Sequence, residues 1–337
     1  MMFTSQNTLN EIMKEPEVRR WFPVLYRMNL LDPLEQLRDL PLEEAVKQAD
    51  IREMSPERQR DSILETANLI REILEGKRSC LRLYTWEDWQ PKETFDAGDP
   101  DNIFLITPRK TDPAQSLKRP VLLIAPGGAY DHVSYRNEGT PLQRRAEEKG
   151  YAAFMIRYRV SPSRYPLPQS DLLSTIRYLR QNAECYQADP EKIVIAGFSA
   201  GGHLCASAAA KYKELGFEDC RPDAVVLGYP VISSDPEIAH EDSIRSLLGE
   251  QYDELREQVS MEHQVSSDFP PAFVWACQDD ALVPAENSIR FAESLQKAKI
   301  PFECHIYRWG GHGIGLGEET SAARWSEEMF RFLNEVL

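Results

Sequence analysis

The sequence predicts an α/β fold in which helices cover both faces of a mainly parallel, eight-stranded sheet, with a helical extension in front of it. Two observations support this prediction. From about residue 80, short apolar runs alternate with helical stretches, and runs that are apolar throughout are typical of strands buried on both faces. Before that point, apolar residues recur at three- and four-residue steps, which indicates helices.

The first 79 residues carry the punctuation of helices. Residues 55–57 read Ser-Pro-Glu, an N-cap followed by proline at the first helical position. The helix expected from Glu57 to Glu75 has an apolar stripe made of Ile63, Ala67, Ile70 and Leu74. We expect residues 1–79 to form a helical extension that packs on the main domain or on a partner subunit, as an oligomerisation element. A cap over the substrate is the alternative.

The main domain is expected over residues 80–337. Two opening strands are predicted at 80–86 and 102–107, joined by a Gly-Asp-Pro-Asp turn at 98–101. Six further strands are expected at 121–125, 152–158, 193–196, 224–227, 272–276 and 302–307. Helices are expected at 140–149, 170–184, 200–215, 286–298 and 321–337. The polar stretch 232–268 between the sixth and seventh strands is expected to be an irregular, cap-like insertion that shapes the substrate entrance.

Composition excludes several partners. The chain has 337 residues, and 39 Lys and Arg against 54 Asp and Glu give a net charge of −15, which would repel a nucleic-acid backbone or an anionic membrane. No run of about 18 apolar residues suits a membrane helix, and a polar N-terminus is unlike a signal peptide. Six cysteines without a Cys-x-x-Cys pair favour a reducing compartment over disulfides or zinc. We therefore expect a cytoplasmic protein with no metal site.

Residues 197–201 read Gly-Phe-Ser-Ala-Gly, directly after the apolar run 192–196 and before an alanine-rich helix. Glycines on both sides of a serine permit a turn too tight for larger residues, and the hydroxyl of Ser199 is then presented at the carboxyl end of the strand. In this strand–turn–helix setting the motif predicts a nucleophile rather than a structural serine.

A serine nucleophile needs a base, and the base needs a carboxylate to orient it. The order expected with this elbow is Ser, then Asp or Glu, then His. Asp279 and Asp280 follow the strand expected at 272–276, and His312 lies in a glycine-flanked loop after the strand at 302–307. The order is met with His312 as the base, and spacing alone leaves the two aspartates as alternatives.

The negative oxygen that forms when Ser199 attacks a carbonyl carbon also needs hydrogen-bond donors. Ala200, the residue after the nucleophile, supplies one backbone N–H group. The loop after the third strand, Pro-Gly-Gly-Ala-Tyr at 126–130, is the expected source of the others, because glycine permits close approach of the backbone to a ligand. Gly128 and Ala129 are the donors we expect there.

Taken together, these motifs resemble the α/β-hydrolase superfamily, and within it the hormone-sensitive-lipase-like acetyl esterases and their bacterial carbohydrate-esterase (acetylxylan-type) relatives. The resemblance covers about Cys80 to Leu337. Its motifs lie at 126–130, 158–159 (Tyr-Arg), 197–204 (Gly-Phe-Ser-Ala-Gly-Gly-His-Leu), 279–284 (Asp-Asp-Ala-Leu-Val-Pro) and 310–313 (Gly-Gly-His-Gly). In these relatives the orienting aspartate stands four residues before the proline of a Val-Pro pair. The resemblance therefore selects Asp280 over Asp279.

The oxyanion loop departs from the family pattern His-Gly-Gly-Gly. Pro126 stands where the relatives have a histidine that braces the loop, and Ala129 stands where they have the third glycine. Backbone donors survive both changes, whereas substrate specificity need not. Nothing before Cys80 resembles a known module.

Five further side chains lie near these motifs, and each has an expected role. Tyr130 is expected either to line the acyl or alcohol pocket or to pack as an ordinary aromatic residue. Glu138 and Arg136 lie close enough to the oxyanion loop to bind a sugar, but a structural or solvated ion pair is the simpler expectation. Asp171 is expected to cap the helix that follows it. His203, in the elbow helix, is expected to pack in the core.

The resemblance implies a serine esterase that cleaves short acyl groups, acetyl above all, from a carbohydrate or another small alcohol. Ser199 would form the acyl-enzyme, His312 would transfer the protons, and Asp280 would orient the imidazole. No cofactor or metal is implied; the expected partner is a small ester, and a homo-oligomer is possible. An amidase or peptidase of the same fold, a long-chain lipase and a non-catalytic binding protein are the alternatives.

Overall fold

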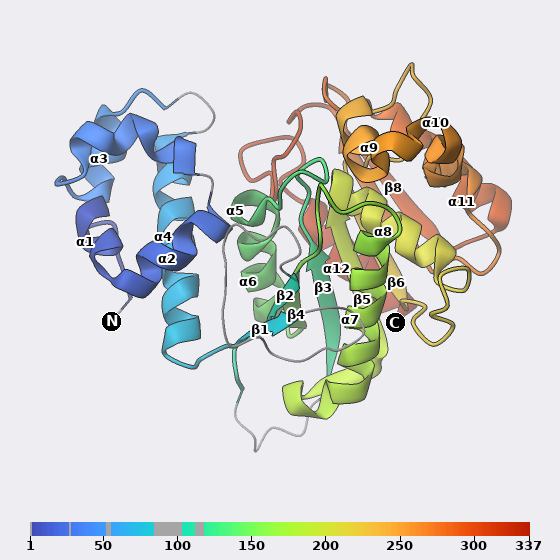
Figure 1. The fold of residues 1–337 in the computed structure, drawn as a ribbon, viewed down its shortest axis with the longest axis horizontal. Helices are drawn as coiled ribbons and strands as arrows, with labels where there is room; N and C mark the ends of the chain where they lie inside the picture. The colour runs from blue at the N-terminus through green and yellow to red at the C-terminus, as the bar shows by residue number, and fades with distance from the viewer. Residues whose placement is uncertain (1, 27, 52–54, 84–102, 112–117) are drawn as a thin grey trace.

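The computed structural model describes residues 2–26, 28–51, 55–83, 103–111 and 118–337 (Figure 1). Within these residues an eight-stranded sheet has the order β1-β2-β4-β3-β5-β6-β7-β8. The strands are β1 Cys80–Leu83, β2 Ile103–Ile106, β3 Arg119–Ala125, β4 Ala152–Arg157, β5 Ala188–Phe198, β6 Ala224–Gly228, β7 Ala272–Cys277 and β8 Phe302–Tyr307. β3 to β8 are parallel, and β2 runs antiparallel to both β1 and β4. The prediction of a mainly parallel, eight-stranded sheet is confirmed.

Helices cover both faces of this sheet, as predicted. α7 and α8 pack on each other and on β5, and α11 packs on β7 and β8; on the other face α6 packs on β3 and β4, and α12 on β6 and β7. The bounds are α5 Tyr135–Glu138, α6 Thr140–Glu148, α7 Leu167–Asn182, α8 Ala200–Lys211, α11 Glu286–Ala298 and α12 Trp325–Val336. Because the carboxyl ends of parallel strands meet at one edge of a sheet, the loops after β3, β5, β7 and β8 lie at the same edge.

The residues before β1 fold as helices that share a continuous apolar core with the sheet domain. They are α1 Leu9–Lys14, α2 Pro16–Leu25, a 3₁₀ segment Met28–Leu37, α3 Leu42–Gln48 and α4 Pro56–Leu74, drawn in blue beside α5 and α6 in Figure 1. The ring of Trp21 meets Phe104 of β2 edge-on at 6.1 Å, and Phe104 stacks on Tyr135 of α5 at 5.9 Å. The helical extension therefore packs on the main domain of its own chain, while its function stays a prediction.

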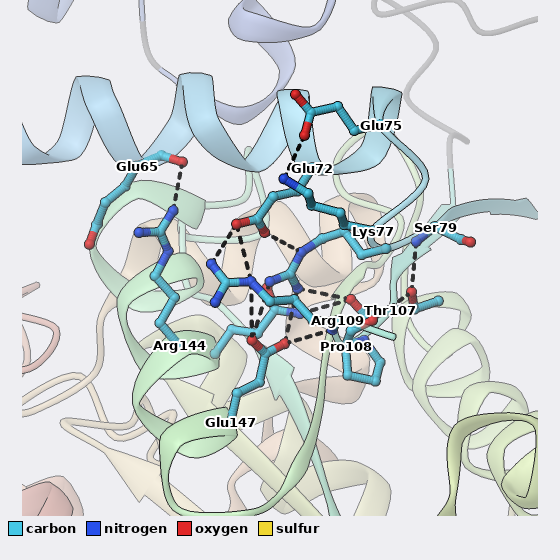
Figure 2. Close-up of polar contacts among 12 residues, drawn as sticks. Glu65, Glu72, Glu75, Lys77, Ser79, Thr107, Pro108, Arg109, Arg144 and Glu147 are labelled. Atoms are coloured by element: carbon cyan, nitrogen blue, oxygen red, sulfur yellow. Dashed lines mark hydrogen bonds and ion pairs between the residues drawn. The ribbon is translucent and has the colours of Figure 1, made fainter. Parts of the chain in front are cut away.

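A buried charged cluster also joins the extension to the main domain (Figure 2). The Arg78 side chain is fully buried and donates to Glu72 of α4 at 2.8 Å, to both carboxylate oxygens of Glu147 of α6 at 3.1 and 3.2 Å, and to the Thr107 carbonyl at 3.0 Å. Arg109 donates to Glu72 from the other side at 3.1 Å. Burial tends to raise the pKa of Glu72, but the two arginines outweigh it and lower that pKa.

Two local expectations were wrong. Residues 232–268 are not irregular: they contain α9 Glu241–Leu248, α10 Tyr252–Leu255 and short 3₁₀ turns, and α9 buries Ile244, Leu247 and Leu248. A polar sequence with a three- and four-residue apolar step is a surface helix, not a loop. Asp171 does not cap a helix, because α7 already begins at Leu167. It lies one turn inside that helix and accepts hydrogen bonds from the backbone and guanidinium of Arg159 at 2.6–3.1 Å.

Other strand and helix bounds agree with expectation to within a few residues, and β8 and α11 agree at both ends. The expected turn at 98–101 and the end of the first expected strand, at 84–86, lie outside the described residues.

Glu65 gives a stability prediction. It lines a cleft of about 310 Å³ between α4, α6 and the segment 316–318, where burial, opposed by the charge of Arg144 and aided by Asp61 and Glu318, raises its pKa from 4.5 to about 7. The folded state then holds the proton more tightly than the unfolded state, so stability falls as the pH rises from about 4.5 to above 7. We expect Glu65→Gln to be more stable than wild type by about 1–3 kcal/mol at pH 8.

Urea unfolding followed by circular dichroism at pH 5 and pH 8 tests this expectation. The difference between the two proteins should shrink at pH 5, where Glu65 is protonated in the folded state. A variant that is less stable than wild type at pH 8 would contradict the prediction.

Candidate active site

Ser199 sits at a sharp turn between β5 and α8, with φ 53° and ψ −122°. The flanking glycines are required here. A Cβ atom on Gly197 would lie 2.1 Å from the carbonyl oxygen of Gly201, and one on Gly201 would lie 2.1 Å from that of Ala125. The Ser199 N–H donates to the Gly228 carbonyl at 3.0 Å, which ties the strained turn to β6. The local sequence thus places the hydroxyl at the carboxyl edge of the sheet.

Ser199, His312 and Asp280 form a hydrogen-bonded chain. Ser199 Oγ lies 2.8 Å from His312 Nε2, and His312 Nδ1 lies 2.7 Å from Asp280 Oδ2. The other carboxylate oxygen of Asp280 accepts from the N–H groups of Leu282 and Val283. Since an ionised carboxylate only accepts, Nδ1 carries the proton and Nε2 is free to accept the serine proton.

Asp279 has a different task. One of its oxygens accepts from the backbone N–H groups of Gly310 and Gly311, both at 2.9 Å, and so it holds the loop that carries His312. Of the two aspartates that spacing left open, the structure brings Asp280 to the histidine.

The expected oxyanion donors lie on two elements. The N–H of Ala200 is at the first position of α8, where a helix leaves its N–H groups without an internal partner. Gly128 and Ala129 have positive φ values of 129° and 55°, and within the described part of the chain no acceptor is found for their N–H groups. These backbone groups fit the role that the sequence predicts for them.

Tyr130 is 1% exposed, which favours the packing alternative over a place in the substrate pocket. Its hydroxyl lies 2.8 Å from His203 Nδ1, and His203 Nε2 lies 2.8 Å from the Val259 carbonyl of the insertion. Burial lowers the pKa of His203 to about 4, so this imidazole is neutral and donates to Val259. The pair joins the oxyanion loop, the elbow helix and the insertion.

Within the described structure, the contacts of the Glu138 carboxylate are hydrogen bonds. Glu138 is 4% exposed and accepts from the Gly127 N–H at 2.7 Å and from the Tyr229 hydroxyl at 2.9 Å. The Tyr158 hydroxyl donates to the Pro126 carbonyl at 2.7 Å. The oxyanion loop is therefore braced by Glu138 and Tyr158 in place of the histidine that the family pattern has at position 126. Sequence reasoning named Glu138 but missed this contact, and it missed Tyr229 altogether.

His240 is a second residue that sequence reasoning did not bring to the site. It caps α9 in the insertion, and burial together with the charge of His312 lowers its pKa. The charge of His312 is therefore felt within the insertion. A cavity of about 950 Å³ lies at the opposite edge of the sheet and is lined by Arg109, Arg119 and Tyr186 among others. Ser199, Asp280 and His312 do not line it.

The sheet order, the elbow at Ser199 and the loops after β7 and β8 define an α/β hydrolase. The model of one family, BD-FAE, matches residues 110–295, more than half of the sequence, and the chain belongs to this family. The resemblance stated on the motifs is thereby confirmed.

Known relatives include the protein named endo-1,4-beta-xylanase B of Butyrivibrio fibrisolvens, 36% identical over 222 residues that cover 62% of this chain and 35% of that protein. An acetylxylan esterase of Xylanibacter ruminicola is 33% identical over 57% of this chain and 40% of its own length. The chain thus spans well under half the length of these two relatives.

Solved structures are matched over nearly their whole length. One of them is the acetyl ester-xyloside bifunctional hydrolase of Caldicellulosiruptor lactoaceticus, 35% identical, with a TM-score of 0.66 over 77% of this chain and 96% of that one. Within the described residues, no helix is long and apolar enough to cross a membrane. The same residues contain no group of three or more His, Cys, Asp or Glu side chains able to hold a metal ion.

Proposed function

We propose that the protein is a serine-dependent carboxylic ester hydrolase that removes short acyl groups, acetyl above all, from a carbohydrate or another small alcohol. The observation that carries the proposal is the chain of hydrogen bonds from Ser199 Oγ through the imidazole of His312 to Asp280, at 2.8 and 2.7 Å. A hydroxyl, a neutral base and an orienting carboxylate in this order are the parts that acyl transfer needs.

In the proposed reaction, Ser199 Oγ attacks the ester carbonyl carbon as its proton passes to His312 Nε2. The N–H groups of Ala200, Gly128 and Ala129 stabilise the negative oxygen of the tetrahedral intermediate. The C–O bond to the alcohol then breaks, and the imidazolium gives its proton to the leaving oxygen. A water molecule, deprotonated by the same imidazole, attacks the carbonyl carbon of the acyl-serine. The bond from that carbon to Ser199 Oγ then breaks, Oγ takes the proton back from the imidazolium, and the acid is released. The bond from His312 Nδ1 to Asp280 keeps the neutral imidazole in the tautomer that accepts at Nε2 and orients the imidazolium.

The substrate class rests on relatives rather than on a shaped pocket. Acetyl esters appear in the names of the Xylanibacter ruminicola and Caldicellulosiruptor lactoaceticus proteins, at 33% and 35% identity. The insertion, where the charge of His312 is felt at His240, is the element we expect to select the alcohol.

Hydrolysis of a nitrophenyl ester series from acetyl to decanoyl, with acetylated xylo-oligosaccharides in parallel, tests the proposal. We expect activity confined to short chains, release of acetate from the sugars, and no activity above background for Ser199→Ala. A fluorophosphonate probe should label wild type and not the variant, because it reacts with an activated serine.

Each alternative function predicts a different result. An amidase or peptidase would be labelled by the probe but would cleave anilides in preference to esters. A non-catalytic binding protein would be neither labelled nor active. Ester hydrolysis that is indifferent to Ser199→Ala would refute the proposed nucleophile.

A further inference from the structure

The strongest unexplained feature of the site is the buried carboxylate of Glu138, which the proposed reaction does not use. It ends the short helix α5 behind the oxyanion loop, and each of its two oxygens accepts one hydrogen bond, from the Gly127 N–H and from the Tyr229 hydroxyl. Gly127 has no room for a side chain, because a Cβ atom there would lie 2.8 Å from the Ser199 Cβ atom and 2.9 Å from the Glu138 carboxylate. Glu138 is thus separated from the nucleophile by a single glycine.

The second oxygen of Glu138 leads to the loop that carries His312. The Tyr229 hydroxyl accepts from the Gly315 N–H at 3.1 Å, so its own proton goes to Glu138. The ring of Tyr229 lies against the imidazole of His312, with 4.8 Å between the ring centres. In this series of hydrogen bonds, each donor is directed toward Glu138, which is the pattern expected of an ionised carboxylate.

The neighbouring residue of α5 contacts the same loop. The side-chain amide of Asn137 donates to the Gly313 carbonyl at 3.1 Å, and a Cβ atom on Gly315 would lie 2.2 Å from the Asn137 carbonyl oxygen. Two adjacent residues of one helical turn therefore hold both halves of the site: Glu138 holds the oxyanion loop, and Asn137 and Glu138 together hold the histidine loop.

Burial raises the pKa of Glu138, and the charge of His312 and the two hydrogen bonds oppose that rise. The attraction between Glu138 and a protonated His312 is mutual, because electrostatic coupling between two sites is reciprocal. A negative charge placed behind the imidazole is useful in acyl transfer, since the imidazole becomes positive when it takes the serine proton.

We propose that Glu138 is a positioning residue: its carboxylate fixes the oxyanion loop relative to the histidine loop, and its charge favours the imidazolium form of His312 that the reaction passes through. The inference rests on the proposed function for the roles of Ser199 and His312, but the electrostatic part concerns the free protein and can be measured without substrate.

The test compares wild type with Glu138→Gln, which keeps the shape of the side chain and removes its charge. The midpoint of the His312 imidazole titration is followed by NMR on ¹⁵N-histidine-labelled protein, with His312→Asn used to assign the resonance. We expect the midpoint in Glu138→Gln to move to lower pH. Ser199 faces one ring nitrogen of His312, the titratable groups around the imidazole in the described structure are Asp280, Tyr229, His240 and Glu138, and only Glu138 is changed.

Ester hydrolysis gives the second readout. We expect kcat of Glu138→Gln to fall by on the order of tenfold to a hundredfold with KM little changed, as for a site whose groups are slightly misplaced, and the acid limb of kcat/KM to move to lower pH. Tyr229→Phe retains the charge and removes the link to Gly315, so it should lower kcat while leaving the imidazole midpoint near that of wild type.

Glu72→Gln is the matched control. Glu72 is also buried, but it lies in α4 and belongs to the charged cluster around Arg78. This variant should lower thermal stability and leave both the imidazole midpoint and the acid limb unchanged. An unmoved midpoint in Glu138→Gln overturns the electrostatic role. A kcat loss that only parallels a loss of thermal stability overturns positioning. If wild type hydrolyses no ester, the proposed function fails, while the midpoint still decides the part that concerns Glu138 and His312.

Discussion

Replacing Asp280 by asparagine should lower kcat/KM for a short ester by about 10⁴-fold, without unfolding the protein. The amide oxygen can still accept from the N–H groups of Leu282 and Val283, so the loop should keep its shape. The amide NH₂ group would then face His312 Nδ1, which must become an acceptor. The proton moves to Nε2, and the imidazole can no longer accept the proton of Ser199.

Asp279→Asn is the matched control for this prediction, because it changes the adjacent residue in the same way. The Asp279 oxygen accepts from Gly310 and Gly311, and an amide oxygen can do the same. We expect its kcat/KM to stay close to wild type, and a steady-state assay of both variants at one pH suffices. Should Asp279→Asn lose the rate and Asp280→Asn keep it, the assignment of the carboxylate would be reversed.

Replacing Arg78 by alanine should lower the free energy of unfolding by about 3–5 kcal/mol, which is a large part of the stability of an ordinary domain. Arg78 is fully buried, and without it the carboxylate of Glu147 loses a bidentate partner and that of Glu72 loses one of its two arginines. A buried charge without its partner costs more than the pair contributes, because water cannot replace the lost bonds. Urea unfolding at pH 7 measures the loss.

Arg177 offers a matched control at the surface. It pairs with Asp219 at 2.6 Å, which is shorter than any contact of Arg78, but 35% of the arginine side chain and 63% of the aspartate side chain are exposed. Arg177→Ala should therefore cost about 1 kcal/mol or less. Equal losses for the two variants would show that burial is not what gives the Arg78 cluster its strength.

The part of the site that was predictable from the sequence is the part encoded within short stretches. The elbow at Ser199 is recognisable because strand, glycines and helix are consecutive, and the order of Asp and His follows from the strands that precede them. The residues alone did not separate Asp280 from Asp279; the family resemblance favoured one, and the three-dimensional arrangement agrees.

The parts that were missed depend on contacts between distant residues. Glu138 meets Gly127 from 11 positions away and Tyr229 from 91, and a helical turn of four residues gives no periodic signal that would mark its carboxylate as buried. Asp171 was misassigned for a similar reason: its partner Arg159 stands before the helix, and the helix begins at Leu167 rather than at the expected residue 170. The helix α9 in the polar insertion was not predicted, because only three apolar residues form its buried stripe.

The shared core of the extension and the sheet domain has a practical consequence for protein engineering. A fragment that starts at Cys80 would remove Trp21 from Phe104 and would take from Glu147 its bidentate partner Arg78. Such a fragment would expose an aromatic patch beside a carboxylate that has lost its buried partner, and it would tend to associate through that new surface. The apparent mass of the fragment would then reflect association caused by the truncation, not the oligomeric state of the full chain. A recombinant module or a fusion partner should be joined ahead of α1, not between α4 and β1.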